Sequence, residues 1–321
     1  MNARKYSYDK FEELNAQLEK EFELDLSNEL EQYIHRDPNF NRIQPVMTWC
    51  MRQKQTTGRT LSNVTENANF VTDRTSLSKI ATTPYEDRTF GWKLQCRRIG
   101  KTIFMCPYKV LEENEHFNSP LQQENSYVRE KLRNIVTMPY SDFKNMESPY
   151  LNPNNSYHHV NLVELCNKEE SAQFSVLYAS QVDILKKGKP VEIRCHTGNF
   201  GAGKAWRSKT MKWYFQFVFS GADEVIIARK SRDHLKIEFI DEVPTKIFRA
   251  EAEENMWWTQ NGCLSFLFEV LKEVHEKLHN LPEGKALVVT HNPQSTNVIF
   301  EVRDDEPNFI PFEFTQTFPN L

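Results

Sequence analysis

The segment from residue 179 to residue 197 carries charged side chains at a spacing that suits phosphoryl chemistry. Asp183 precedes Glu192 by nine positions, and Arg194 stands two positions after that glutamate. Hard divalent cations bind mainly carboxylate oxygens, and a bound cation polarises a phosphoryl oxygen and activates water. A neighbouring basic group stabilises the negative charge that develops on the phosphate. Because Glu-x-Lys/Arg pairs also occur in ordinary strands, the pattern fits either a metal-dependent nuclease site or a structural strand pair.

A glycine-rich loop follows this segment and offers a second candidate site. Residues 198–204 read G-N-F-G-A-G-K and fit the phosphate-binding pattern G-x-x-x-x-G-K, between a predicted strand and a predicted helix. In that pattern the backbone amides hold the phosphates and the lysine meets the terminal phosphate. However, Ala205 stands where the pattern has the Ser or Thr that binds Mg²⁺. We therefore expect a flexible loop whose Lys204 and Arg207 face an anion, and no nucleotide hydrolysis.

The charge of the chain is unevenly distributed. Residues 1–40 hold 5 Lys and Arg and 10 Asp and Glu, whereas residues 186–232 hold 11 Lys and Arg and only 3 acidic residues. These segments have net charges of −5 and +8 within a chain whose formal net charge is −4. A basic segment concentrated in an acidic protein predicts either a polyanionic partner such as RNA or a solvated basic face.

The hydrophobic pattern predicts the elements that position these residues. Alternating apolar residues around a Gly-Lys pair predict a hairpin over 89–107, and strands at 172–184 and 190–196 flank the basic turn. Apolar residues at steps of three to four predict helices. The other expected elements are helices over 122–136, 206–219 and 256–279, a strand pair at 224–229 and 234–240, and a final hairpin over 286–293 and 296–303.

The N-terminal residues 1–40 are predicted to form an acidic amphipathic helix, centred on 8–34, that packs on the rest of the chain. A break in this helix near Asp25 to Ser27 stays open as an alternative. The polar, turn-rich stretches at 52–70 and 150–157 are expected to be loops. No repeat, low-complexity tract or obvious linker interrupts residues 1–321. The sequence therefore predicts a single α+β domain with helices packed around mixed β-sheet.

Several residues that could bind metal or RNA have plainer explanations. None of the six cysteines forms a C-x-x-C pair, so zinc-ribbon and thioredoxin sites are excluded and six free thiols are expected. His158, His159 and His196 are expected to be strand or loop residues, and Trp257 and Trp258 to belong to the core. No apolar run approaches the ~20 residues of a membrane-spanning helix, and the N-terminus has no apolar signal core. We therefore expect an intracellular protein of the cytoplasm or nucleus.

Several motifs, in the same order, resemble the DXO family of RNA 5′-end decapping exoribonucleases. The segment at 71–92, which contains R-T-S-L-S-K-I-A-T-T-P-Y-E and ends in G-W, is similar to the family's Arg and T-T-P-Y-E segment. S-Q-V-D at 180–183 resembles its S-G-E-V-D motif, and V-E-I-R at 191–194 resembles its V-E-L-K motif. Residues 206–216, W-R-S-K-T-M-K-W-Y-F-Q, resemble its W-R-S segment and its K-h-h-K-W-h-x-Q helix, in which h is apolar.

This resemblance implies a fold and a set of site residues. The fold would be α+β, with two mostly antiparallel or mixed β-sheets flanked by helices, and the substrates would be triphosphate-, incompletely capped or NAD-capped RNA. Mg²⁺ or Mn²⁺ would be held by Asp183, Glu192 and the backbone carbonyl of Ile193. The resemblance and the basic pattern together predict catalytic residues Asp183, Glu192, Arg194 and Gln216, and RNA contacts from Arg74, Arg194, Lys204, Arg207, Lys212 and Gln216.

Three positions depart from the family pattern. Gln181 stands where the motif has a carboxylate, which removes a full negative charge from the ligands of the cation. The family's G-Y-x-x-E helix segment is matched to residues 137–145, where Phe143 falls in register with the catalytic Glu and Asp142 lies one position away. Arg194 replaces a lysine, which keeps the charge but moves the charged atoms. With two carboxylates lost, we expect at most one weak metal site.

The interpretation that follows is an RNA 5′-end-binding pseudoenzyme whose catalysis is lost or strongly impaired. An active divalent-metal-dependent decapping nuclease that uses Asp183, Glu192 and Asp142 stays open as an alternative, and so does a protein-interaction scaffold. Fungal relatives that support a large exoribonuclease give the scaffold a precedent by analogy. An exoribonuclease or another protein is therefore a candidate partner beside RNA 5′ ends, whereas binding to membranes and recognition of DNA sequence are not expected.

Overall fold

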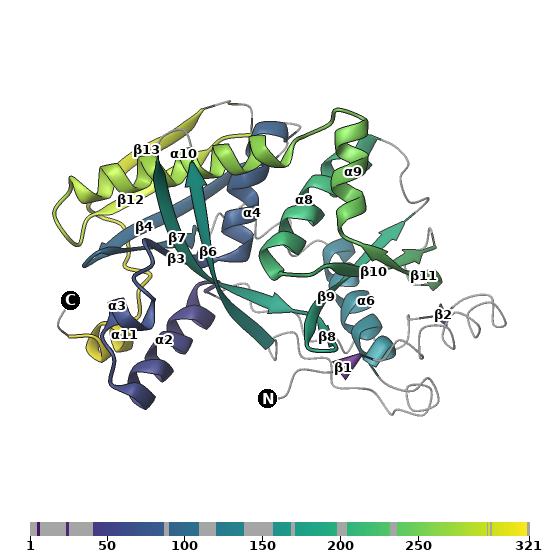
Figure 1. Cartoon of the computed structure of the whole chain (residues 1–321), viewed down its shortest axis with the longest axis horizontal. Helices are drawn as coiled ribbons and strands as arrows, with labels where there is room; N and C mark the ends of the chain where they lie inside the picture. Colours follow the sequence, from purple (N-terminus) through teal and green to yellow (C-terminus); the bar gives the residue numbers. More distant parts are fainter. Residues whose placement is uncertain are drawn as a thin grey trace. The chain divides into compact units, whose positions relative to one another are not determined.

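The computed structural model describes residues 5–6, 24–25, 41–86, 90–108, 120–137, 157–167, 171–197, 204–231, 236–293, 295 and 297–319 (Figure 1). Contacts between Cα atoms divide the chain into two compact units. Unit 1 comprises residues 1–39, 111–157 and 181–254, and unit 2 comprises residues 40–110, 158–180 and 255–321. Each unit is assembled from three separate stretches of the chain, so neither unit is a continuous segment that could be read as a domain of its own. The predicted single domain therefore stays a prediction.

Unit 2 contains a seven-stranded mixed sheet with the order β13-β12-β4-β5-β3-β7-β6. The strand β3 (Phe70–Asp73) runs parallel to β5 and β7, whereas the pairs β4–β5, β4–β12 and β12–β13 are antiparallel. Both predicted hairpins are confirmed, and the first turns at Gly100, whose φ of +58° favours glycine. The remaining strands are β4 (Trp92–Ile99), β5 (Thr102–Pro107), β6 (Tyr157–Asn167), β7 (Ala172–Val182), β12 (Ala286–His291) and β13 (Val298–Arg303).

The helices of unit 2 differ from the prediction in one region. The expected loop at 52–70 is wrong, because α2 (Gln44–Thr57) extends into it and α3 (Leu61–Val64) lies within it. Polar side chains dominate this stretch because they face solvent, and the boundaries are set by local caps: Gly58 ends α2 with a φ of +69°, and the Thr60 side chain accepts from the backbone of Asn63. The other helices are α4 (Arg74–Thr82), the 3₁₀ turn η2 (Thr83–Tyr85), α10 (Gln260–His279) and α11 (Phe312–Thr317).

The long helix α10 confirms the expected C-terminal helix, although it begins four residues later than predicted. Its first turn is capped by the Thr259 hydroxyl, which accepts from the backbone N–H of Gly262. The helix packs against α4, β4 and β12 (Figure 1). The buried side chains of α10 include Leu267, Phe268 and Leu271, which fall at helical spacing along one face.

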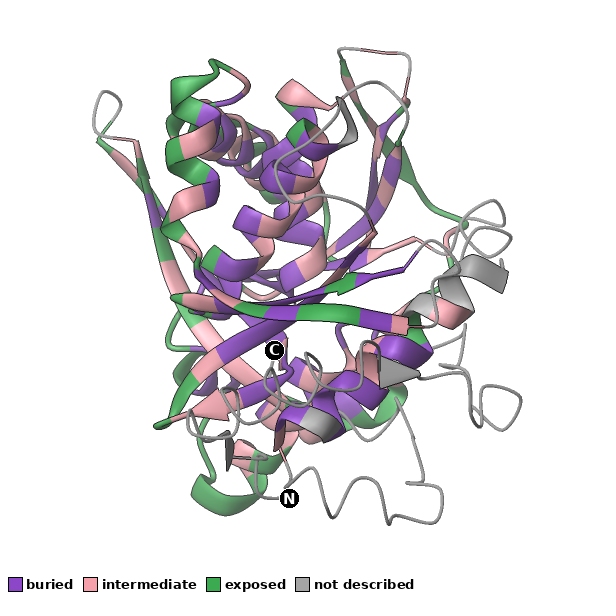
Figure 2. Ribbon diagram, turned by 90° about the vertical axis from the view of Figure 1, so that its right-hand side faces the viewer, coloured by how far each residue is buried: buried purple, intermediate pink, exposed green. Residues whose placement is uncertain are grey.

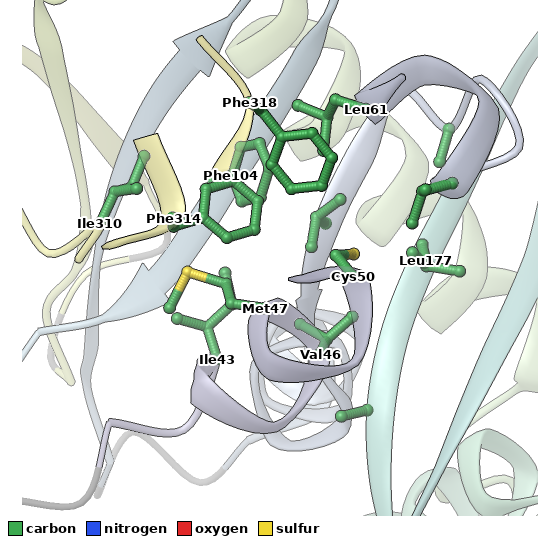
Figure 3. Close-up of a cluster of buried hydrophobic side chains, with 14 of the residues drawn as sticks. Ile43, Val46, Met47, Cys50, Leu61, Phe104, Leu177, Ile310, Phe314 and Phe318 are labelled. Carbon is green, nitrogen blue, oxygen red and sulfur yellow. The ribbon is translucent and has the colours of Figure 1, made fainter. Parts of the chain in front are cut away.

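A second apolar cluster of unit 2 joins α2 to the C-terminal segment. Met47 and Cys50 of α2 lie beside Phe314 and Phe318, and Phe104 of β5 completes the group (Figure 3). The rings of Phe104 and Phe314 meet edge to face with centroids 5.4 Å apart. Because these segments are more than 200 residues apart in the sequence, their burial holds the end of the chain against the sheet.

Unit 1 contains a six-stranded mixed sheet with the order β1-β8-β9-β10-β11-β2. The neighbours β9 and β10 are parallel, whereas β8–β9 and β10–β11 are antiparallel, as the predicted strand pair requires. A continuous helix over 8–34 is wrong at Leu24–Asp25, where β2 pairs with β11, beside the break considered near Asp25 to Ser27. The other residues of the predicted helix lie outside the described part of the chain. The strands are β1 (Lys5–Tyr6), β2 (Leu24–Asp25), β8 (Ile184–Lys186), β9 (Lys189–Thr197), β10 (Glu224–Lys230) and β11 (Lys236–Pro244).

Three helices of unit 1 position the side chains that matter below. They are α6 (Pro120–Thr137), α8 (Lys204–Ser220) and α9 (Lys246–Glu254), and the first two confirm the predicted helices. Tyr127 and Leu132 of α6 are buried in one cluster with Ile193 of β9 and Ile226 of β10. Figure 2 shows the buried residues as stripes along helices and strands, as expected where one face of each element packs against the core.

Most of the simpler expectations for single residues are also met. All six cysteines are free, and Trp258 is buried with 1% of its surface exposed. Trp257 is only half-buried, so its predicted place in the core is wrong. His158 and His159 lie in β6, and His196 lies in β9. In the described residues, no helix is both long enough and apolar enough to cross a membrane.

Candidate functional site

The predicted strand over 172–184 is interrupted at Asp183. β7 ends at Val182 and β8 begins at Ile184, so Asp183 occupies a one-residue junction between two strands. After β8 the chain turns at Lys187 and Gly188, both of which have positive φ, and β8 pairs with β9. This turn brings β9 back beside the junction, where the Oδ2 atom of Asp183 accepts a hydrogen bond from the backbone N–H of Ile193 at 3.0 Å.

Arg194 touches all three groups that the sequence assigns to a metal ion. Its Nη1 atom donates to the carbonyl oxygen of Ile193 at 2.7 Å and lies 3.6 Å from Oδ2 of Asp183. Its Nη2 atom lies 2.9 Å from Oε2 of Glu192 and donates to Oε1 of Gln216 at 2.6 Å. One guanidinium therefore contacts the two predicted carboxylate ligands, the predicted carbonyl ligand and the predicted catalytic glutamine.

Helix α6 brings two further arginines to the same carboxylate. Arg129 and Arg133 are four residues apart and so lie on one face of the helix, which packs against β9. Both donate to Oδ1 of Asp183, Arg133 at 3.0 Å. Arg133 also donates to Oε2 of Glu130 at 2.6 Å. The buried carboxylate of Asp183 thus faces three guanidinium groups and one backbone amide.

These contacts explain the electrostatics of the site. Burial by itself would raise the pKa of the Asp183 carboxyl, but Arg129, Arg133 and Arg194 outweigh it and hold that pKa well below its usual range. Burial likewise opposes the charge of Arg129, whereas Asp183 and Glu192 raise its pKa above the usual value. A buried charge is tolerated only where partners of opposite sign surround it, and here each charge is held by the others.

Guanidinium groups face the oxygens to which the sequence assigns a divalent cation. No group of three or more His, Cys, Asp or Glu within the described ranges is placed to hold a metal ion. Both oxygens of Asp183 already accept from donors, and the carbonyl of Ile193 accepts from Arg194. A cation that bound these oxygens would have to displace positively charged groups from them.

Sequence reasoning missed three residues of this cluster, namely Arg129, Glu130 and Arg133. The spacing of the two arginines within the predicted helix was a usable signal. A second signal is the segment S-Y-V-R-E at 126–130, which has the Tyr-x-x-Glu spacing of the family's G-Y-x-x-E segment and lies on a helix. Phe143 and Asp142, to which that segment was matched, lie outside the described residues.

The other predicted site residues are spread over both units. In unit 1, Gln181 lies near the end of β7 and is half-buried, Arg207 is exposed on α8, and Lys212 is half-buried on α8. Lys204 begins α8, and the glycine-rich loop before it lies outside the described residues. In unit 2, Arg74 begins α4 and is buried, directly after Asp73, whose side chain caps the helix.

Comparisons with known proteins agree on the family. The model of the RAI1-like PD-(D/E)XK nucleases matches residues 2–315. The decapping nuclease dom-3 of Caenorhabditis elegans is 23% identical over 307 residues, which cover 92% of this chain and 75% of that protein.

Solved structures have the same fold. Rai1 of Candida albicans in complex with pU5-Mn²⁺ superposes with a TM-score of 0.79 at 14% identity, over 99% of this chain and 90% of that one. Dxo1 of K. lactis in complex with manganese gives a TM-score of 0.66 at 10% identity, over 97% of this chain and 84% of that one. The expected α+β fold with two mixed sheets and flanking helices is therefore confirmed. Because the family model matches nearly the whole chain, this protein is a member of the RAI1/DXO family of PD-(D/E)XK decapping nucleases.

Proposed function

We propose that this protein binds RNA 5′ ends and that its catalysis is lost or strongly impaired. The observation that carries the proposal is the position of Arg194, which contacts Asp183, Glu192 and the carbonyl of Ile193. In the resemblance these groups would hold Mg²⁺ or Mn²⁺. The guanidinium supplies positive charge to them, but it offers no coordination site at which water could be activated, which is the step a metal contributes.

The binding half of the proposal rests on the basic residues and on the relatives. Rai1 of Candida albicans is known in complex with pU5-Mn²⁺, and Rai1 of Scheffersomyces stipitis in complex with (3′-NADP)⁺ and calcium ion. A mutant of S. pombe Rai1 with three glutamate substitutions is in complex with 3′-FADP, so nucleotide binding in that protein does not require those glutamates. In this chain we assign phosphate contacts to Arg74, Lys204, Arg207 and Lys212, and such contacts make binding weaken as salt rises.

A second candidate function is favoured by Glu130. This residue belongs to a Tyr-x-x-Glu segment on α6, and it is joined to Asp183 through Arg133. If Glu130 is the family's helix glutamate, three carboxylates remain in the cluster despite Gln181. An active decapping nuclease would then need the arginines to move away from Asp183 when RNA and metal bind. Either function would place the protein where RNA 5′ ends are processed, in the cytoplasm or nucleus, and a protein partner such as an exoribonuclease remains a proposal.

The deciding experiment compares the natural protein with a double variant, Gln181→Glu with Arg194→Lys, which restores the family residues at both positions. Binding and cleavage of 5′-triphosphate RNA and NAD-capped RNA are measured with Mn²⁺ or Mg²⁺, with EDTA as the control. We expect the natural protein to bind RNA without cleaving it and the double variant to gain cleavage that EDTA abolishes.

A triple variant that adds Asp183→Asn serves as the matched control and should lose the gained cleavage. EDTA-sensitive cleavage by the natural protein at the rate of its intact relatives would refute the pseudoenzyme and favour the second candidate. A natural protein that neither binds nor cleaves RNA would refute both.

A further inference from the structure

The last turns of α10 carry two histidines that lie outside the candidate catalytic cluster. Residues 275–279 read H-E-K-L-H, so His275 and His279 are four positions apart on the helix. Side chains at this spacing lie one above the other on the same face. The two imidazole rings stack with their centroids 4.0 Å apart and with 28° between the ring planes. The two side chains are therefore close enough to contact one small ligand together.

A hydrogen bond to the backbone fixes the tautomer of the second histidine. Nδ1 of His279 lies 3.0 Å from the carbonyl oxygen of His275. Because a carbonyl oxygen only accepts, Nδ1 carries a hydrogen, and in the neutral ring Nε2 keeps its lone pair. Histidines that bind metal ions are held in the same way, with one ring nitrogen donating to a carbonyl or carboxylate and the other facing the ion.

The ring of the first histidine is held by aromatic side chains of the sheet. His275 is half-buried, and its ring centroid lies 5.2 Å from that of Phe174 in β7 and 6.3 Å from that of Phe70 in β3. Among the described residues this ring makes no hydrogen bond, so none of them occupies either nitrogen. Burial, and then His279, lower the pKa of His275. The ring is therefore neutral at pH 7, which is the form that binds a metal ion.

A pair of neutral imidazoles selects a particular class of ligand. Imidazole nitrogen suits Zn²⁺, Cu²⁺ and Ni²⁺, whereas Mg²⁺ and Ca²⁺ prefer oxygen. The one positively charged residue between the two histidines is Lys277, whose Nζ atom lies 2.9 Å from Oε1 of Glu273. Its charge is therefore balanced within the helix and does not repel a cation at the histidine pair.

The motif itself occurs in zinc enzymes. In metallopeptidases the pattern H-E-x-x-H on a helix binds Zn²⁺ through both histidines, and the glutamate acts as the general base. That chemistry also needs a third protein ligand. Within the part of the chain that the structure describes, no group of three or more His, Cys, Asp or Glu is placed to hold a metal ion. The two histidines therefore support a binding site whose other positions are open to water, and not a hydrolytic centre.

We propose that His275 and His279 bind one transition-metal ion of the Zn²⁺ class, with water completing its coordination. The pair belongs to unit 2, whereas the cluster around Asp183 belongs to unit 1, so the site does not depend on the proposed function. An ion that bridges two positions one turn apart joins the last turns of α10. Its binding should therefore stabilise the folded protein.

The test uses the full chain carrying Cys166→Ser as the parent protein, because the exposed thiol of Cys166 would also bind Zn²⁺. Zinc binding is measured by isothermal titration calorimetry, and the Tm is measured in zinc chloride, in magnesium chloride and in EDTA. His279→Gln removes one ligand at an exposed position, and His279→Cys replaces it by another zinc ligand. The matched control is the exchange variant, His279→Asn with Asn280→His, which keeps the composition but moves the imidazole by about 100° around the helix.

We expect the parent protein to bind one Zn²⁺ per chain and to gain a rise in Tm that Mg²⁺ does not produce. His279→Gln should weaken zinc binding by at least about tenfold, because even the outer partners of ligating histidines are worth roughly 10–100-fold in metal affinity. The exchange variant should lose as much, whereas His279→Cys should keep most of the affinity. In EDTA the Tm of His279→Gln should match that of the parent, since this side chain is exposed.

Two results would overturn the metal site. One is a parent protein that shows neither a binding heat nor a change of Tm with Zn²⁺. The other is zinc binding that His279→Gln and the exchange variant retain at the affinity of the parent, because the ion would then be held elsewhere in the chain.

Discussion

Replacing Asp183 by asparagine tests whether arginines or a metal ion balance the charge of the candidate site. In the structure the Asp183 carboxylate faces Arg129, Arg133 and Arg194 and accepts from the backbone of Ile193. Its removal leaves the buried Arg133 and Arg194 and the half-buried Arg129 with one fewer partner. Breaking a buried ion pair by removing one side costs about 3–5 kcal/mol, a large share of the roughly 5–15 kcal/mol that stabilises a typical domain.

An open metal site predicts the opposite sign. Carboxylates gathered around an absent cation repel one another, so Asp183→Asn would relieve repulsion and stabilise the protein in EDTA. We therefore expect urea unfolding in EDTA to show a loss of about 3–5 kcal/mol. The control is Asp223→Asn, which removes an exposed ion pair with Lys189 and should cost less than about 1 kcal/mol.

The pH dependence of the free energy of unfolding provides a second test of the Asp183→Asn variant. The folded-state pKa of Asp183 is lowered, so its contribution is fully present above the unfolded value of about 3.9 and is lost as pH falls through the folded pKa. The stability difference between the natural protein and Asp183→Asn should therefore stay constant from pH 7 to pH 5 and shrink only in strong acid. A variant as stable as the natural protein in EDTA, or more stable, would refute the arginine-held site.

Three further predictions concern the metal response of the candidate site, a half-buried histidine and the apolar cluster around Phe314. Mn²⁺ should leave the Tm of the natural protein unchanged and raise that of the Gln181→Glu, Arg194→Lys variant, because the guanidinium that contacts the ligand oxygens is gone; an equal response of both proteins in a thermal shift assay would contradict this. Burial lowers the pKa of His275, so the unfolded chain binds the proton more tightly than the folded protein does. The free energy of unfolding should therefore fall as pH drops below about 6.5. The unfolding midpoint of His275→Gln should fall less over the same pH range, and an identical pH profile in both proteins would exclude His275 as the cause. Phe314→Ala should cost about 3–5 kcal/mol in urea unfolding because the ring is fully buried, whereas Phe312→Ala, at a position that is 72% exposed, should cost little; equal losses would contradict the described packing.

The local pattern of the sequence was sufficient to predict most of the helices and strands. Alternation around Gly100 predicted the first hairpin, and the apolar spacing of 122–136 and 206–219 predicted α6 and α8. These predictions hold because strand and helix periods depend on neighbouring residues. The stretch at 52–70 was misjudged for the same reason, since its polar composition hides a helix whose stability comes from packing Met47 and Cys50 against distant residues.

The sequence by itself determined the family, the fold class and the presence of Asp183, Glu192 and Arg194 in one segment. Only the tertiary structure decided what surrounds them. Arg129 and Arg133 are 54 and 50 residues from Asp183 along the chain, and no local period relates them. Their contact arises because α6 packs on β9 and because a buried carboxylate must find positive partners once it is removed from water.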